Sequence, residues 1–215
     1  MIWDLPTRLF HWGLVVLVLI AWRSAEVSDM TTHLWAGAGV AGLLVFRVWW
    51  GLFGSSTARF ASFVKGPRTV AAYARSLSTT AEPHTGHNPM GGWSVIALLL
   101  CLLALIGFGL FAVDTDGLDS GQFADYVDFD TGRIASHLHA RFFDGLEVLV
   151  ALHLCAILFY HLIKRHKLVH AMVTGRQPHL AEEEAFIPGS RPMLAVGATL
   201  GLAVALVLTH LGGAF

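Results

Sequence analysis

Long apolar runs alternate with shorter polar stretches along this chain. A helix needs about 20 mostly apolar residues to cross the roughly 30 Å hydrocarbon core of a bilayer, and five runs are suited to do so. The first is not expected to be a cleaved signal peptide, because Trp22 and Arg23 close it without a small-residue cleavage site. The pattern predicts an all-α integral membrane protein. The predicted spans are residues 9–22, with a start nearer Pro6, then 33–53, 93–113, 139–162 and 193–211.

Charged residues divide the connecting stretches into two groups. The stretches after the second and fourth spans are basic, whereas the stretch before the fourth span is acidic. Because basic loops stay on the cytoplasmic side, we expect a cytoplasmic N-terminus and a C-terminus on the outer side. The residues are Arg59, Lys65, Arg68 and Arg75 after the second span, Lys164, Arg165, Lys167 and Arg176 after the fourth, and Asp114, Asp116, Asp119, Asp125, Asp128 and Asp130 before it.

Composition agrees with this picture and argues against several other classes. The 215 residues are 55% hydrophobic and 13% charged, which is too apolar for an ordinary soluble domain. A net charge of −1 without a basic stripe gives no sign of nucleic-acid binding. Cys101 and Cys155 lie inside apolar runs without CxxCH, CxxC or zinc spacing, so we expect neither covalent haem attachment nor a disulfide framework.

The polar stretch at residues 54–92 is too long for a simple turn. Within it, residues 58–77 (ARFASFVKGPRTVAAYARSL) are amphipathic, which predicts an interfacial cytoplasmic segment with its apolar side chains toward lipid. In the acidic stretch, three glycines favour irregular backbone over a helix. The apolar side chains are Phe60, Phe63, Val64, Val70 and Tyr73, and the glycines are Gly117, Gly121 and Gly132.

Two histidines in the fourth predicted span are fourteen residues apart, at His139 and His153. At about 100° and 1.5 Å per residue they share one helix face and are separated by about 21 Å along it. An imidazole inside a bilayer is unfavourable unless something binds it. Two of them on one face near opposite leaflets suit two haem irons, one above the other.

Two further histidines lie at matching depths. His11 is near the inner side of the first span, and His33 opens the second span on the outer side. Depth therefore pairs His33 with His139 in an outer site and His11 with His153 in an inner site. Two neutral imidazoles on one haem iron leave no position open for oxygen, which suits electron transfer. The alternatives are hydrogen-bonded core histidines, or a metal-ion pathway that would need carboxylates or thiols at one depth.

The other histidines are less suited to bind a haem iron by their position. His137 competes with His139, but it lies about 160° from His153 around the helix. His161 shares the His139 face about 33 Å away, where it is expected at the inner boundary. We expect solvated side chains at His166, His170 and His179, a structural role at His210, and no ligand role that can be assigned to His87.

Arg47 lies inside the second predicted span and follows His33 by fourteen residues, which places it on the same helix face near the inner leaflet. A haem carries two propionates, and a buried guanidinium pairs well with a carboxylate. We expect Arg47, assisted by Arg8, to neutralise a propionate of the inner haem. The alternative is that Arg47 extends to the lipid headgroups.

Taken together, several segments make the chain resemble the bacterial cytochrome b-561 and nickel-iron hydrogenase b-type cytochrome family. They are WDLPTRLFHW, HLWAGAGVAGLLVFRVWWGLFGS, ARFASFVKGPRTVAAY, GHNPMGG, HLHARFFDGLEVLVALH and KRHKLVHAMVTGR, within residues 2–176. The resemblance implies a bacterial inner-membrane protein whose four-helix core binds two non-covalent b haems. Their ligands would come from the first, second and fourth spans, and match His11, His33, His139 and His153.

The resemblance also implies electron exchange between the membrane quinone pool and a redox partner. It suggests two parts: residues 1–176 as the dihaem core and residues 177–215 as a cytoplasmic linker with an additional fifth span, which is expected to dock a partner subunit or a second copy. Asp144 and Glu147 depart from the Leu-rich run of similar proteins. They are candidates to accept the protons that quinol oxidation releases, or to pair with Arg141 or line a protein interface.

The sequence therefore predicts a cytochrome b of the respiratory chain that passes electrons between membrane quinol and a periplasmic c-type cytochrome. The acidic outer stretch is expected to attract this partner. One alternative is the membrane anchor of a larger enzyme such as a hydrogenase. Others are a superoxide:quinone oxidoreductase and, from another class, a haem or metal-ion carrier. In this interpretation the chain is an electron-transfer protein, as a quinol-oxidising oxidoreductase or as a subunit of one, alone or as a homo-oligomer.

Overall fold

The computed structural model describes residues 2–77, 87–115, 119–176 and 186–211. In these residues, five helices are long and apolar enough to cross a membrane. This confirms the prediction of an all-α chain with five candidate spans. They are α1 (Leu5–Glu26), α2 (Met30–Phe53), α5 (Pro89–Phe111), α6 (Phe129–Leu162) and α8 (Arg191–Leu211). Predictions on Asp116, Gly117, His179 and the linker at 177–185 lie outside the described residues.

Shorter helices and turns connect the spans. The predicted interfacial segment contains α3 (Phe60–Phe63) and α4 (Pro67–Ser76). The described part of the acidic stretch contains the 3-10 turn η1 (Ala124–Tyr126), and α7 (Leu168–Thr174) follows α6.

Side-chain caps set the start of four spans. The carboxylates of Asp4, Asp29 and Asp128 each accept a hydrogen bond from the backbone N–H three residues on, and the Asn88 side chain does the same before α5. Such caps satisfy N–H groups that have no partner inside the helix. The cap at Asp128 also explains why α6 begins ten residues before the predicted start at 139.

The expectation of irregular backbone at Gly132 was wrong, because this residue lies inside α6. A Cβ atom built on Gly132 would approach Val113 Cγ2 to 2.3 Å. Gly132 therefore lets the end of α5 pass close to the first turns of α6.

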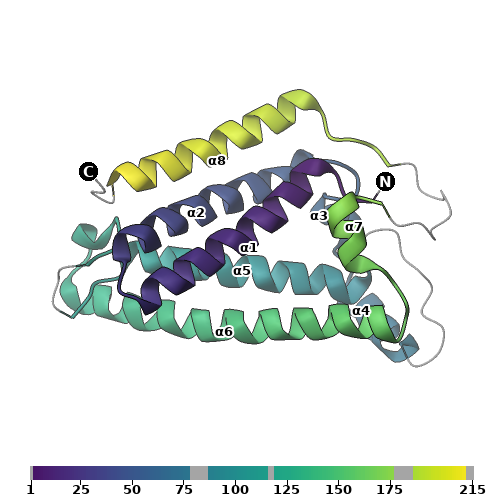
Figure 1. Cartoon of the computed structure of the whole chain (residues 1–215), viewed down its shortest axis with the longest axis horizontal. Helices are drawn as coiled ribbons and strands as arrows, with labels where there is room; N and C mark the ends of the chain where they lie inside the picture. Colours follow the sequence, from purple (N-terminus) through teal and green to yellow (C-terminus); the bar gives the residue numbers. More distant parts are fainter. Residues whose placement is uncertain (1, 78–86, 116–118, 177–185, 212–215) are drawn as a thin grey trace.

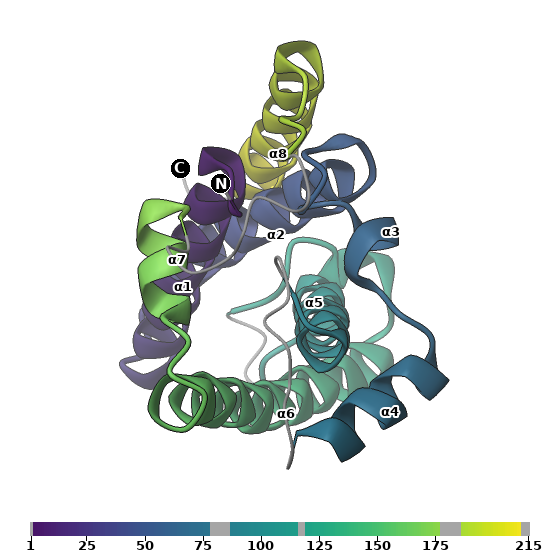
Figure 2. The same ribbon diagram turned by 90° about the vertical axis from the view of Figure 1, so that its right-hand side faces the viewer.

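The helices are arranged as a bundle with α8 on one side and α6 on the other (Figures 1 and 2). The main helix pairs are α1 with α2, α5 with α6, and α2 with α8. Gly42 and Gly201 bring α2 and α8 close together, since a Cβ on either would lie within 2.6 Å of the other's carbonyl oxygen. Close approach through small residues is the usual way in which helices associate in lipid. The fifth span is thus docked on the chain's own second span.

The aromatic side chains of the α3–α4 segment were predicted to face lipid, and for two of them this was wrong. Phe63 and Tyr73 are buried. Phe63 packs near the buried Arg47, and the Tyr73 hydroxyl lies 3.0 Å from the Tyr160 hydroxyl of α6. The segment closes the end of the bundle where α1 begins, called here the N-terminal end.

Candidate functional site

His33 and His139 face each other at the opposite end of the bundle, called here the far end. His33 lies in the first turn of α2 and His139 lies in α6. Their ring centroids are 6.0 Å apart and the rings are inclined by 78°. The structure therefore brings together the two residues that helix depth had paired.

Backbone carbonyl groups fix both rings. The Nδ1 atom of His33 lies 2.8 Å from the Ala21 carbonyl oxygen, and that of His139 lies 2.8 Å from the Leu105 carbonyl oxygen. A carbonyl oxygen can only accept, so each Nδ1 carries the proton and donates it. The lone pair of each ring then lies on Nε2. A second-shell hydrogen bond of this kind is what orients histidine ligands on metals.

The separation of the two rings fits one metal ion between them. Imidazole nitrogen lies about 2.0–2.1 Å from a bound first-row metal such as zinc. Two imidazoles on opposite sides of such an ion would have centroids about 6 Å apart, which is the observed spacing.

A cavity of about 230 Å³ adjoins both histidines. Two of its lining residues are glycines on the helices that flank it. A Cβ on Gly109 would lie 2.8 Å from His139 Nδ1, and a Cβ on Gly37 would meet no atom within 4 Å. Gly109 thus makes room for the ring, while Gly37 leaves open space beside His33. A flat group larger than a lone ion would have space here.

Arg133, which was not among the predicted site residues, also lines this cavity together with Ser136. Its guanidinium donates to the Val113 carbonyl oxygen at 3.2 Å. The sequence contained a signal, since Arg133 is the one base among the acids before the fourth predicted span.

His11 and His153 lie at the N-terminal end, on α1 and α6. Both are half-buried, and they are close enough for their charges to interact. The His11 Nδ1 atom is buried without a hydrogen-bond partner. The structure thus brings the second predicted pair into one region of the bundle.

Buried polar atoms without a partner lie at the N-terminal end of the bundle, and one of them belongs to His11 itself. An unpaired buried polar atom costs about 1–3 kcal/mol, so a cluster of them indicates a polar group that the chain alone does not supply. In the described residues these atoms are Thr7 Oγ1, Arg8 Nε, His11 Nδ1, Arg47 Nη1, Ser55 Oγ and His87 Nδ1.

Arg47 is held inside the bundle with only 3% of its surface exposed. This contradicts the alternative that it extends to lipid headgroups. Its guanidinium lies 4.7 Å from the centre of the Phe60 ring and 6.0 Å from that of Phe10, distances at which a cation is attracted by an aromatic face. The carboxylate that influences it is Asp4, which already accepts from Trp50 Nε1 at 2.9 Å.

Arg8 has a structural contact in addition to any binding role. Its Nη1 donates to the Val173 carbonyl oxygen at 2.5 Å, at the end of α7. A guanidinium at a helix C-terminus is favourable because the last carbonyl groups there lack partners. The Nε atom of Arg8 remains among the unpaired buried atoms.

His87 occupies the same region, although the sequence assigned it no role. Its ring packs 4.5 Å from Trp3 and 4.6 Å from Phe63, measured between ring centres. Burial lowers the pKa of His87 to about 3, and the positive charge of Arg47 adds to this effect. The ring is therefore neutral at physiological pH.

Asp144 and Glu147 lie away from both histidine pairs, on the exposed face of α6. Asp144 forms an ion pair with Arg141 at 3.4 Å, which was one of the alternatives for it. His137 and His161 are also exposed. In the described parts of the chain, no three His, Cys, Asp or Glu side chains gather to hold a bare metal ion.

Comparison with known proteins gives one finding. The family model described as prokaryotic cytochrome b561 matches residues 2–175. No curated protein and no solved structure matches the chain. The match covers the four histidines, Arg8, Arg47 and Arg133, and confirms the resemblance noted from the sequence.

The pKa of His87 predicts a specific pH dependence of stability. Because its pKa is lowered from 6.5 to about 3 in the folded chain, the unfolded chain binds more protons between these values. Stability is fully present above pH 6.5 and falls below it, by at most about 1.4 kcal/mol per pH unit. We expect His87→Gln to reduce the loss of thermal stability between about pH 7.5 and about pH 5.

The measurement is the unfolding temperature of the purified protein at the two pH values. His161→Gln, at an exposed position of α6, serves as the matched control and should behave like the wild type. Equal losses in the wild type and in His87→Gln would show that His87 does not titrate as described.

Proposed function

The chain belongs to the prokaryotic cytochrome b561 family, and we propose that it binds two b haems and carries electrons across the membrane. Membership makes it a multi-pass membrane b-type cytochrome that acts in electron transfer. Each b haem, when bound, supplies an iron that takes up and releases single electrons. The remaining questions concern which residues hold the haems and which partners exchange the electrons.

The outer haem site in this proposal uses His33 and His139. The observation that carries it is the pair of rings 6.0 Å apart, each with Nδ1 held by a backbone carbonyl group. Both Nε2 atoms are thereby left to bind the iron. Arg133, at the rim of the adjoining cavity, supplies a positive charge for a propionate.

The inner haem site uses His11 and His153. Support comes from their proximity and from the unpaired buried atoms around them. The Arg47 guanidinium has an unpaired Nη1 atom in this cluster, and a propionate would provide the missing acceptor. The two levels are separated by about 21 Å along α6, from the rise of fourteen residues.

The partners follow from the surfaces at the two ends. With the N-terminus on the cytoplasmic side, as basic residues next to α2 and α6 suggest, the far end faces the periplasm of a bacterial inner membrane. The acidic residues Asp114, Asp119, Asp125, Asp128 and Asp130 are all exposed there. They favour a basic partner such as a c-type cytochrome, with membrane quinol as the electron donor.

Removing one proposed histidine ligand tests which residues hold each haem. We expect His153→Ala to lose the inner haem and keep the outer one, because the ligands of the two sites lie at different depths. Haem content per chain, measured from the absorbance of the pyridine complex, should fall by half. His161→Ala, on the same helix but exposed, should retain the full content. Retention of both haems by His153→Ala would refute the assignment.

The two arginines should affect different haems. A positive charge near a haem favours the reduced form, so its removal lowers the midpoint potential. About 60 mV corresponds to a tenfold change in a one-electron equilibrium. We expect Arg47→Gln to lower the potential of the inner haem and Arg133→Gln that of the outer haem. A redox titration of both variants measures this, and a shift of the same haem in both would contradict the assignment.

Electron donors and acceptors are tested on purified protein. Quinol should reduce the haems, and a basic c-type cytochrome should then reoxidise them with a rate that falls as salt rises.

Reduction by superoxide instead, with quinone as acceptor, would favour the superoxide:quinone reaction. Co-purification with a nickel-iron subunit would favour a hydrogenase anchor, and rapid loss of haem to an acceptor protein would favour a carrier. Failure of quinol to reduce bound haem would refute the proposed donor.

A further inference from the structure

His87 is a buried side chain that neither proposed haem site uses as a ligand. Its ring is enclosed by Trp3 and Phe63, and its Nδ1 atom is buried without a hydrogen-bond partner among the described residues. Because an unpaired buried polar atom is unfavourable, a purely apolar ring would suit this position better if packing were its only role. The histidine therefore indicates a polar group that the chain itself does not supply.

Arg47 brings a second unpaired nitrogen to the same region. Its guanidinium is buried, and its Nη1 atom has no hydrogen-bond partner in the described chain. Phe63, which packs on the His87 ring, lies 5.9 Å from the guanidinium carbon of Arg47, measured to the ring centre. The charge of Arg47 also acts on His87. Two buried polar side chains thus lie beside one aromatic ring, and each leaves a nitrogen unpaired.

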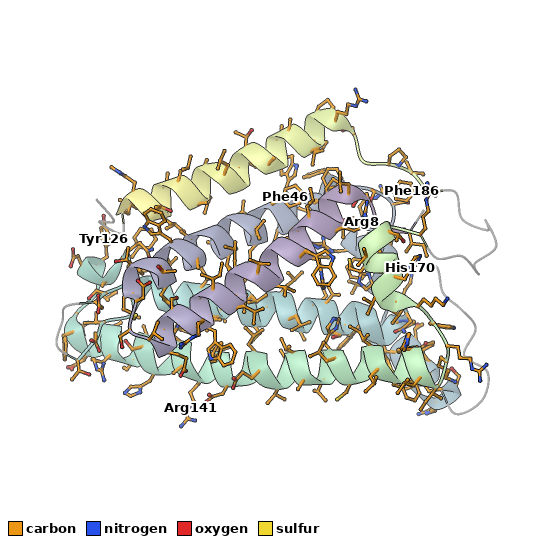
Figure 3. All side chains as sticks on the ribbon, viewed as in Figure 1. Arg8, Phe46, Tyr126, Arg141, His170 and Phe186 are labelled. Atoms are coloured by element: carbon orange, nitrogen blue, oxygen red, sulfur yellow. The ribbon has the colours of Figure 1, made fainter. Side chains whose placement is uncertain are left out.

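This region adjoins the proposed inner haem site. His153 is close enough for its charge to act on His87, so the His87 ring lies near a proposed ligand of the inner haem. Arg8, whose Nε atom is also unpaired, lies at this end of the bundle where α1 meets α7 (Figure 3). The unpaired nitrogens are therefore located at the level where the inner haem is proposed.

A carboxylate from outside the chain matches these nitrogens. A guanidinium donates hydrogen bonds and a neutral imidazole donates one, whereas a carboxylate accepts through two oxygens. The carboxylate that the chain places nearby is Asp4, and its two oxygens already accept from the Thr7 N–H and from Trp50 Nε1. Among the described residues Asp4 forms no ion pair with Arg47. An acceptor for His87 and Arg47 is thus still missing.

We propose that His87 binds a propionate of the inner haem, with Nδ1 donating to one carboxylate oxygen while Arg47 Nη1 donates to the other. This inference rests on the proposed inner haem at His11 and His153. It adds a residue that holds the edge of that haem and does not touch its iron. The aromatic rings on either side of His87 fix the donor in place before haem binds, so little side-chain freedom is lost on binding.

Two substitutions separate this hydrogen bond from packing. His87→Phe keeps an aromatic ring against Trp3 and Phe63 but removes the donor. His87→Asn loses the ring but places an amide N–H near the position of Nδ1. A hydrogen bond withdraws negative charge from the propionate and so favours the reduced iron. We expect His87→Phe to lower the reduction equilibrium of the inner haem at least about threefold, or about 30 mV, and His87→Asn to stay close to the wild type.

The measurements use purified haem-loaded protein in lipid nanodiscs. A redox titration follows both haems by absorbance, and the inner haem is the one that His153→Ala lacks. Redox-induced infrared difference spectra follow the carboxylate stretch of the propionates, which should shift in His87→Phe and not in His87→Asn. The outer haem should be unchanged in both variants, and its absorbance verifies that they are folded. His161→Phe, at an exposed position of α6, is the matched control and should leave both readouts unchanged.

The outcomes separate this inference from the proposed function. A wild type that binds haem only at the far end would overturn the inference together with the inner haem site. Two bound haems with an unchanged potential and an unchanged propionate band in His87→Phe would overturn the inference alone, and would assign a water molecule to His87 Nδ1. Equal shifts in His87→Phe and His87→Asn would also overturn it, because the effect would then not come from the donor.

Discussion

The structure of the far end depends on two hydrogen bonds from histidine rings to backbone carbonyl groups. The Ala21 and Leu105 carbonyl oxygens hold His33 and His139 in one tautomer and one orientation. Inside an apolar bundle such bonds are strong, because water does not compete for the donor or the acceptor. Each carbonyl belongs to a neighbouring helix, so ring orientation depends on how α1 packs on α2 and how α5 packs on α6.

Glycines at the helix contacts support this arrangement of the rings. Gly109 lets α5 pass the His139 ring at close range, and Gly132 lets the end of α5 cross α6. Gly42 and Gly201 join α8 to α2, the helix that carries both His33 and Arg47. A fifth span docked in this way supports, from outside, the helix that carries His33. Small residues at these contacts are therefore part of the support of the site.

The length of the apolar runs predicted the five candidate spans, and helix rise and turn grouped the histidines by depth and face. The sequence pattern could not locate the start of α6, since the first ten residues of that helix mix polar and apolar side chains and are fixed by the cap at Asp128. It also could not show that Phe60 and Phe63 surround Arg47 rather than face lipid. Contacts between segments distant in sequence decide such points, and Arg133 and His87 were missed for the same reason.

Polar groups within the bundle and on its lipid-facing surface are stabilised in different ways. Inside the bilayer a charge or an imidazole needs a partner. Arg47 is buried among aromatic rings near Asp4, and the histidines of the far end are bonded through Nδ1 and leave Nε2 for a ligand. Glu147 lies on the outward face of α6, and no ion pair forms with it among the described residues. The same rule supports the proposal of haem at the paired histidines.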